Sequence, residues 1–353
     1  MVECKRGCPP QTRMVFIWTL VLVATACPAF AATPAGREKL RGAIERAIPL
    51  LEKSSAGSAD NRTCFTCHHQ ALPVMALHEA RGRGLAIDEQ NFRKQVEHTR
   101  KHLERGRANY ERGKGQGGQV LTAGYALWAL EAGGEKSDEL TTAVVHYLLE
   151  RQSDQTHWSH PGSRPPSSGS EFATTYVAAR ALLVFADSSQ EARVQQRLDV
   201  VKQWLQEKKP QDTEDQVFRL RLANYLELPG VQQAAVDGLI TGQREDGGWG
   251  QLGEMPSDAY ATATAVVALQ RTLQASSAAG DLRTRAVDAI RRGVDFLLAH
   301  QQADGTWHVK TRAKPIQAYF ETGFPYEKDQ FISTSATAWS VIALCLAMES
   351  AEN

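Results

Sequence analysis

Two stretches of sequence decide the fold of this chain: QREDGGW at residues 243–249 and QQADGTW at residues 301–307. Each places Trp six residues after Gln, and Gly247 or Gly305 permits a tight turn between them. A variant, QSDQTHW at 152–158, keeps the same spacing. A Gln at a helix end can satisfy orphan backbone groups, and the Trp can cover the apolar edge between neighbouring units. Repeats of this kind predict stacked supersecondary units.

Outward from these loops, the chain alternates between two kinds of predicted helix. One kind carries a single apolar stripe, as at Leu40, Ile44, Ile48 and Leu51. The other is apolar and small nearly all round, as in YATATAVVAL at 260–269, and must be buried on every side. The striped helices are expected at 36–54, 88–106, 138–151, 190–206, 231–243 and 282–301. Their buried partners are expected at 68–82, 119–132, 171–186, 213–227, 258–275 and 331–349. The sequence therefore predicts an all-α protein of six helical hairpins.

The composition narrows the class of protein. The chain has 353 residues, with 40 basic and 40 acidic side chains and a pI of about 7.1. This balance argues against a nucleic-acid partner, which usually requires a basic face. With 42% hydrophobic and 23% charged residues, the chain resembles an ordinary globular protein and is long enough to bury a large core.

The first segment is predicted to direct export. Lys5, Arg6 and Arg13 precede a short apolar run that ends in Ala29-Phe30-Ala31, which is typical of a secretory signal peptide at residues 1–31. A membrane anchor or a lipid on Cys27 is the alternative, but the run falls short of the length that spans a bilayer. We expect a periplasmic or secreted protein, with residues 32–353 as a single domain and no later membrane span.

The Gln-…-Gly-x-Trp loops between alternating helices resemble the prenyltransferase and squalene-cyclase repeat superfamily, squalene–hopene cyclases included, across nearly the whole mature chain. The resemblance implies an α6/α6 toroid, in which six inner helices enclose a central cavity and six outer helices surround them. Members of this superfamily cyclise isoprenoids, transfer prenyl groups or bind proteins, so that the fold alone does not fix the function.

The strongest chemical motif is Cys64-Phe65-Thr66-Cys67-His68. Cys-x-x-Cys-His attaches c-type haem: Cys64 and Cys67 would form the thioethers, and His68 would be the proximal iron ligand. Predicted export favours this interpretation. Two alternatives remain open, a Cys64–Cys67 disulfide and a zinc site that uses His68. For a second axial ligand the candidates are His157, His160 and His308; we prefer His308, because ring closure would bring the sixth hairpin beside the first.

A second candidate site is acidic. Asp212-Thr213-Glu214-Asp215 resembles the Asp-x-Asp-Asp motif of squalene–hopene cyclases, in which the central Asp is implied to protonate an alkene. Glu214 stands in that place here. The simpler alternative is an ordinary helix start, with Asp212 as N-cap and Asp215 favoured by the helix dipole.

Three functions follow from the sequence. The first is an exported binding or redox module that carries haem or a metal at Cys64–His68. Its cavity would hold an apolar small molecule, an isoprenoid-like ligand or a protein partner. The second is an isoprenoid cyclase that uses residues 212–215. The third is a non-catalytic scaffold with a Cys64–Cys67 disulfide. The sequence leaves open whether the chain is an enzyme.

Overall fold

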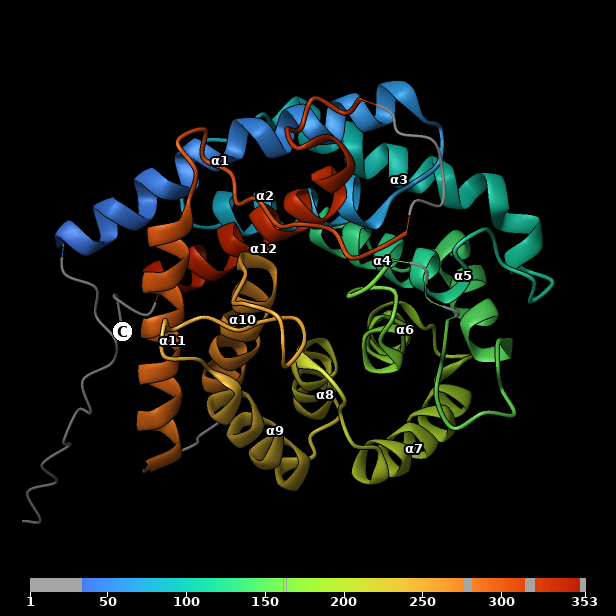
Figure 1. Ribbon diagram of the computed structural model, residues 1–353. Coiled ribbons are helices and arrows are strands. Elements are labelled where there is room, and N and C mark those ends of the chain that lie inside the picture. The colour runs from blue at the N-terminus through green and yellow to red at the C-terminus, as the bar shows by residue number, and fades with distance from the viewer. Residues whose placement is uncertain (1–33, 161, 163, 276–280, 315–320, 350–353) are drawn as a thin grey trace, which may run out of the picture.

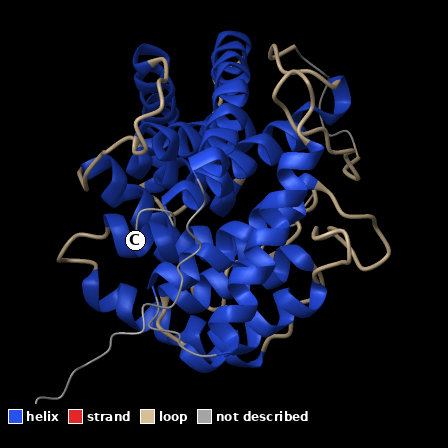
Figure 2. Cartoon of the chain, turned by 90° about the vertical axis from the view of Figure 1, so that its left-hand side faces the viewer, coloured by secondary structure: helices blue, strands red, loops and turns tan. Residues whose placement is uncertain are grey.

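The computed structural model describes residues 34–160, 162, 164–275, 281–314 and 321–349, and within these ranges the chain is helical without a strand (Figures 1 and 2). The outer helices are α1 (Pro34–Asn61), α3 (Glu89–Tyr110), α5 (Glu139–Glu150), α7 (Glu191–Glu207), α9 (Pro229–Gly242) and α11 (Asp281–His300). The inner helices are α2 (Leu72–Arg81), α4 (Gln119–Ala132), α6 (Glu171–Phe185), α8 (Thr213–Tyr225), α10 (Ala259–Ala275) and α12 (Gln330–Glu349). A π-helical turn, η1 (Cys67–Ala71), precedes α2, and a short 3-10 turn, η2 (Glu327–Asp329), precedes α12.

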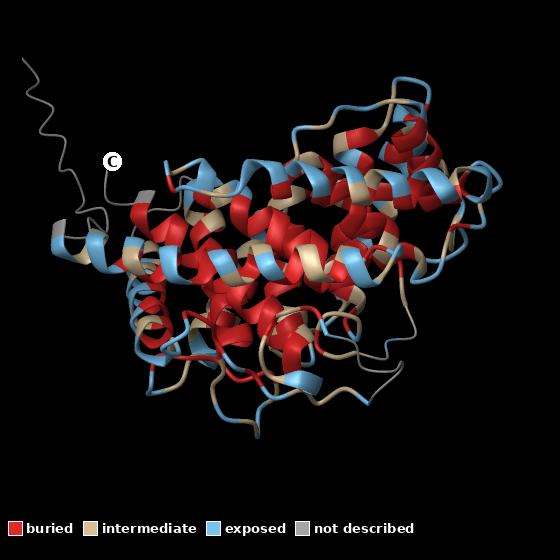
Figure 3. Cartoon of the chain, turned by 90° about the horizontal axis from the view of Figure 1, so that it is seen from above, coloured by how far each residue is buried: buried red, intermediate tan, exposed pale blue. Residues whose placement is uncertain are grey.

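The inner helices form a closed ring. Each of α2, α4, α6, α8 and α10 packs against the next inner helix, and α12 packs against α2 to complete the circle (Figure 1). The outer helices turn one face to solvent while the centre of the molecule is buried, as Figure 3 shows. The predicted α6/α6 toroid is therefore confirmed, and the predicted helix ranges lie within a few residues of the observed ones for all elements except α1.

The Gln–Trp loops, which we call seams, have one geometry in all three hairpins. Each Trp indole donates to the carbonyl of the Leu ten residues before it: Trp158 to Leu148 at 2.9 Å, Trp249 to Leu239 at 2.8 Å and Trp307 to Leu297 at 2.8 Å. The backbone N–H of each Trp donates to a Thr hydroxyl on the following inner helix. Each buried Trp therefore ties an outer helix to its inner partner.

The Gln of a seam reaches the next hairpin. The Gln243 amide donates to the carbonyl of Ala289 on α11 at 2.8 Å, and the Gln301 amide donates to Ala43 on α1 at 2.7 Å. The second bond joins the last hairpin to the first and closes the outer layer. A Cβ on Gly305, whose φ is +91°, would collide with the Arg46 carbonyl of α1, so the close approach requires glycine. Each Gln thus bonds a carbonyl of its own loop and one within the next outer helix, rather than the orphan groups of a helix end that the sequence predicted.

Two features depart from the expectations. Helix α1 continues to Asn61, beyond its predicted end. The added part contains the buried Ser54, Ser55 and Ser58, which pack closely within the fold but form no apolar stripe that predicts a helix. Residues Glu327–Met348 are long and apolar enough to cross a membrane, contrary to the expectation of no such stretch. However, 94% of this segment is buried inside the protein, as befits an inner helix of the ring. The predicted signal peptide, residues 1–31, lies outside the described residues.

Candidate functional site

The Cys64–His68 segment lies between α1 and α2, where hairpins three, five and six have a seam. Thr66 is the N-cap of η1, and its hydroxyl accepts a hydrogen bond from the His69 backbone N–H at 3.3 Å. The Gln70 side-chain oxygen accepts from the backbone N–H and the hydroxyl of Thr66 at 2.8 and 2.5 Å. The turn is therefore held by its own polar groups and presents the thiols and the imidazole in a fixed order.

The donor groups of this turn are chemically available. Cys64 and Cys67 are free thiols; Cys64 is exposed and Cys67 half-buried. The Cys67 sulfur lies 3.7 Å from Nδ1 of His68. Burial lowers the pKa of His68 well below its usual value, with further lowering from His69 and from Arg164. The imidazole is thus neutral, which is the form that ligates metals.

A small cavity of about 150 Å³, open on one side, lies against this turn. Cys67, His68, His160 and Arg164 contribute to its wall, together with Phe331, whose ring meets that of His68 edge-on at 5.5 Å. The structure thus brings His160 to the predicted proximal ligand.

The preferred second ligand, His308, has other contacts. Its Nε2 lies 3.1 Å from a carboxylate oxygen of Asp329, and its ring stacks on Tyr326 at 4.2 Å. His308 does not contribute to the wall of the cavity beside His68. The remaining candidate, His157, stacks on Trp204 at 4.5 Å.

The side chains at this site suit haem, but the cavity beside them is smaller than a haem. Cys67, His68 and His160 line one cavity, and the free thiol of Cys64 lies three residues before Cys67 in the sequence, yet a cavity of about 150 Å³ holds a ligand the size of benzene. A macrocycle therefore requires residues 159–169, which contribute His160 and Arg164, to lie farther out. For zinc, no three His, Cys, Asp or Glu side chains within the described ranges come close enough together to hold an ion.

The acidic motif divides into two roles. The Asp212 carboxylate accepts from the Asp215 backbone N–H at 2.9 Å as the N-cap of α8, and Asp215 accepts from the Ser170 hydroxyl at 2.7 Å. Glu214 instead faces the interior, is 3% exposed and accepts from the Tyr260 hydroxyl at 3.0 Å. Burial, with Asp212 nearby, raises the pKa of Glu214 to about 8, so this carboxyl group is predominantly protonated at neutral pH.

The central cavity of about 640 Å³ lies toward the carboxyl ends of the inner helices. Its wall combines charged and aromatic side chains, namely Arg83, Arg180, Arg221, Arg271, Glu79, Glu131, Trp128, Tyr176, Tyr225 and Trp339. Sequence reasoning missed these arginines. The signal that could have found them is the presence of Arg180 and Arg221 inside two helices, 171–186 and 213–227, that were expected to be buried.

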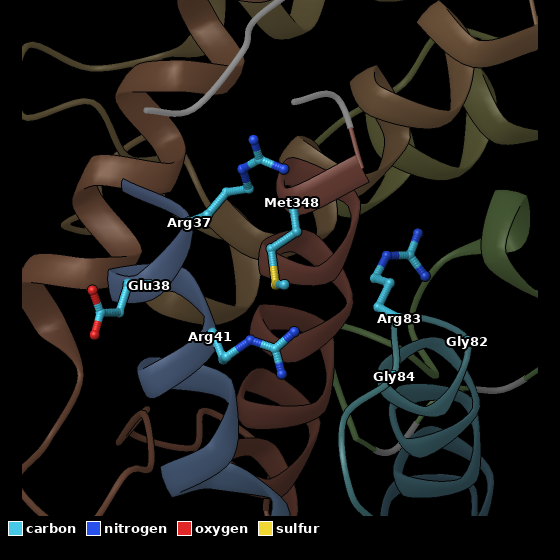
Figure 4. A pocket seen from close by; sticks show the side chains of 7 residues that line it. All are labelled: Arg37, Glu38, Arg41, Gly82, Arg83, Gly84 and Met348. Carbon is cyan, nitrogen blue, oxygen red and sulfur yellow. The ribbon is translucent and has the colours of Figure 1, made fainter. Parts of the chain in front are cut away.

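A further hollow of about 650 Å³ lies where the start of α1, the turn after α2 and the end of α12 meet (Figure 4). Arg37 and Arg41 of α1, Arg83 and Met348 contribute to it. Because Arg83 also lines the central cavity, the two hollows adjoin at this side chain.

Comparisons with known proteins agree with the geometry of the ring. Residues 222–333 match the family model described as squalene-hopene cyclase C-terminal domain. A comparison with curated protein sequences gives no significant match.

Among solved structures, "UGL_D88N/dGlcA-Glc-Rha-Glc" is similar, with a TM-score of 0.55 and 14% identity over 85% of this chain and 95% of that chain. A possible member of the GH105 family from Klebsiella pneumoniae subsp. pneumoniae MGH 78578 has a TM-score of 0.50 and 12% identity over 90% of this chain and 96% of that chain. At these identities the two structures show a shared fold and nothing more. The family match, the closed ring and the repeated seams together support the predicted resemblance to the prenyltransferase and squalene-cyclase-like helical toroids.

Proposed function

We propose that the protein is an exported redox module that carries one haem, bound covalently through Cys64 and Cys67 with His68 as the proximal ligand. The observation that carries this proposal is that Cys64 and Cys67 are free thiols and that the Cys67 sulfur lies 3.7 Å from the neutral imidazole of His68. Thioether attachment needs two free thiols beside the ligating imidazole, and this turn supplies all three. When bound, the haem would supply one-electron transfer.

The protein's own residues would tune that group. His160 is the candidate for the second axial position, in place of His308, because it lines the same cavity as His68. Arg164, also in the wall, is a suitable partner for a haem carboxylate. Phe331 and Leu121 provide apolar surface, which excludes water and raises the effect of nearby charges.

The absorption spectrum of protein exported from a host with haem-attachment machinery tests this proposal. We expect a Soret band that survives denaturation and acid extraction, and that is lost in the double variant Cys64→Ala, Cys67→Ala. Cys345→Ala is the matched control, because it removes the third, buried thiol and should leave the band unchanged.

The axial ligands are tested in the same preparation. His68→Ala should disturb the iron spectrum and hinder attachment, and His160→Ala should change the spectrum while the haem stays bound. His308→Ala should change neither. A colourless protein whose mass is lower by two hydrogens would instead support the disulfide scaffold, and bound zinc without a covalent mass increment would support the metal site.

A second candidate function is isoprenoid cyclisation, which one observation favours. Glu214 is a protonated carboxylic acid inside the ring, hydrogen-bonded by Tyr260, and the superfamily resemblance implies proton donation to an alkene from this position. Incubation with squalene tests it: product should form with the wild type and with Asp215→Asn but not with Glu214→Gln. Product formation by Glu214→Gln would eliminate the acid role of this residue.

A further inference from the structure

Arg221 is a buried cation without an ionic partner. Its side chain lines the central cavity, yet the residue is only 7% exposed. Within the described part of the chain, Nη1 has no hydrogen-bond partner, and no carboxylate forms an ion pair with the guanidinium. An arginine cannot lose its proton in a protein, so the charge stays in place. A buried charge of this kind is costly unless an opposite charge meets it.

Aromatic rings surround the guanidinium on several sides. The guanidinium carbon lies 4.6 Å from the ring centroid of Trp339, 5.2 Å from those of Trp128 and Tyr176, and 5.4 Å from that of Phe218. Cation–π attraction from these rings offsets part of the desolvation cost. These rings do not supply a hydrogen-bond partner for Nη1, however, so this donor is free to meet an anion.

The acidic groups of the cavity are already engaged by other arginines. Glu131 accepts two hydrogen bonds from Arg180, at 2.8 and 2.7 Å, in the bidentate arrangement. Glu79 is shared by Arg83, at 2.7 Å, and Arg271. Four arginines thus face two glutamates, which leaves two positive charges in excess on the wall.

The buried carboxyl group of Glu214 does not supply the missing anion. Glu214, seven residues earlier on α8, influences Arg221 but makes no ion pair with it. Because the pKa of Glu214 is raised to about 8, mainly by burial, this group is predominantly neutral near pH 7. The cavity therefore has a positive charge that the protein itself does not balance.

We propose that the central cavity binds a carboxylate carried on a ring-shaped body, with Arg221 as its ionic partner. The planar guanidinium matches a carboxylate, which it can hold in a bidentate manner. The flat faces of Trp128 and Trp339 beside it suit the ring of the ligand. The volume of about 640 Å³ lies within the range of small-molecule sites. This proposal is independent of the haem, because the site lies at the opposite end of the inner helices.

Titration calorimetry of the mature chain tests the proposal with three ring carboxylates: benzoate, cyclohexanecarboxylate and glucuronate. These probes distinguish an aromatic, an aliphatic and a saccharide ring. We expect at least one of them to bind about tenfold or more tightly than its neutral amide, because a charge-assisted hydrogen bond contributes at least that much. Failure of all three to bind, equal binding of the amide, or tighter binding of inorganic phosphate would overturn the proposal.

Variants assign the binding to Arg221. Arg221→Met should weaken binding by about tenfold or more, and Arg221→Lys should recover part of it, because it keeps the charge but loses the planar fork. Arg271→Gln is the matched control: it removes a positive charge from the same wall, at a residue already paired with Glu79, and should leave binding nearly unchanged. Loss of binding in Arg271→Gln equal to that in Arg221→Met would contradict the assignment.

Stability separates a binding residue from a structural one. Without ligand, Arg221→Met should melt at the same temperature as the wild type or higher, because it removes an unbalanced buried charge. A lower melting temperature would mean that the side chain serves the fold. Should this variant fail to fold, the thermal shift of the wild type with each carboxylate, compared with its amide, still decides whether the cavity binds the anion.

Discussion

The seams of the last two hairpins and the Cys64–His68 turn of the first hairpin occupy equivalent places in their hairpins. The seams hold two helices together, whereas the turn displays reactive side chains. Trp249 and Trp307 are almost fully buried, and each ties its outer helix to its inner one. Hairpin one has no such Trp. Thr66 and Gln70 satisfy its turn locally, Cys64 is exposed, and His68 faces a cavity. A turn that satisfies its polar groups with its own side chains, without a seam Trp, can thus display reactive groups, which is why we place the chemistry there.

The largest expected effect comes from removing a seam Trp. Trp249→Ala or Trp307→Ala should lower the free energy of unfolding by about 3–5 kcal/mol, because each leaves a cavity and removes the indole donor from a Leu carbonyl. Denaturant unfolding measures the loss. Leu183→Ala is the control, because this side chain is 47% exposed and its loss should be within about 0.5 kcal/mol of neutral. A loss as small for both tryptophans would mean that the seams do not hold the ring.

Ring closure at the last seam can be broken at one glycine. Gly305→Ala should cost about 2 kcal/mol or more, since it combines a positive φ with a collision against the Arg46 carbonyl. Gly253→Ala should cost far less, because nothing lies within 4 Å of the added Cβ and no positive φ is recorded there. Equal thermal midpoints for the two variants would show that α1 can move away from the last loop without penalty.

The contrast between holding the fold and serving chemistry recurs at the start of α8. Asp212 caps the helix, whereas Glu214 keeps its proton inside the ring. Between its unfolded pKa of about 4.5 and its folded pKa of about 8, the folded state binds more protons than the unfolded state. The contribution of Glu214 to stability therefore falls as pH rises, by about 1.4 kcal/mol per pH unit.

Unfolding of the wild type and Glu214→Gln at pH 5 and at pH 7.5 tests this sign. The variant should become more stable relative to the wild type as pH rises, because glutamine cannot ionise. Asp138→Asn at the N-cap of α5 provides the comparison and should keep a nearly constant difference over the same range, because hydrogen bonds from the Thr141 backbone and from Arg100 outweigh burial and lower the pKa of Asp138. If the free energy of unfolding of the wild type rose relative to that of Glu214→Gln as pH increased, the assignment of a neutral Glu214 would be contradicted.

The smallest effect is expected from the seam Gln. Gln243→Ala loses three hydrogen bonds, two donated to Gly247 and Ala289 and one accepted from Arg292, at a half-buried position where water can partly replace them. We expect a cost of about 1 kcal/mol in the free energy of unfolding. A cost equal to that of Trp249→Ala would reverse the ranking of the two seam residues.

The sequence predicted what depends on local pattern. The stripes, the small-residue helices and the recurring Gln and Trp gave the two helical layers and the seams, because each is written in neighbouring residues. The sequence did not predict the extension of α1 to Asn61, since its buried serines show no hydrophobic periodicity.

The features of the sites that the sequence did not predict depend on which residues lie close together in space. His160 rather than His308 lines the cavity beside His68, and this follows from where His160 and Arg164 lie relative to the first hairpin. The unbalanced charge of Arg221 likewise emerges only when Glu79 and Glu131 are seen to be engaged by other arginines. No spacing along the chain encodes either result.

Peptide mapping of the exported protein tests most directly whether hairpin one carries the chemistry. Trypsin, which cuts after Arg62 and Arg81, releases residues 63–81 with both Cys64 and Cys67 in one peptide. From a host with haem-attachment machinery, we predict that this peptide alone carries the mass of one haem together with the Soret absorbance. Recovery of the same peptide at its unmodified mass, or at that mass less two hydrogens, with no coloured peptide elsewhere, would contradict the account.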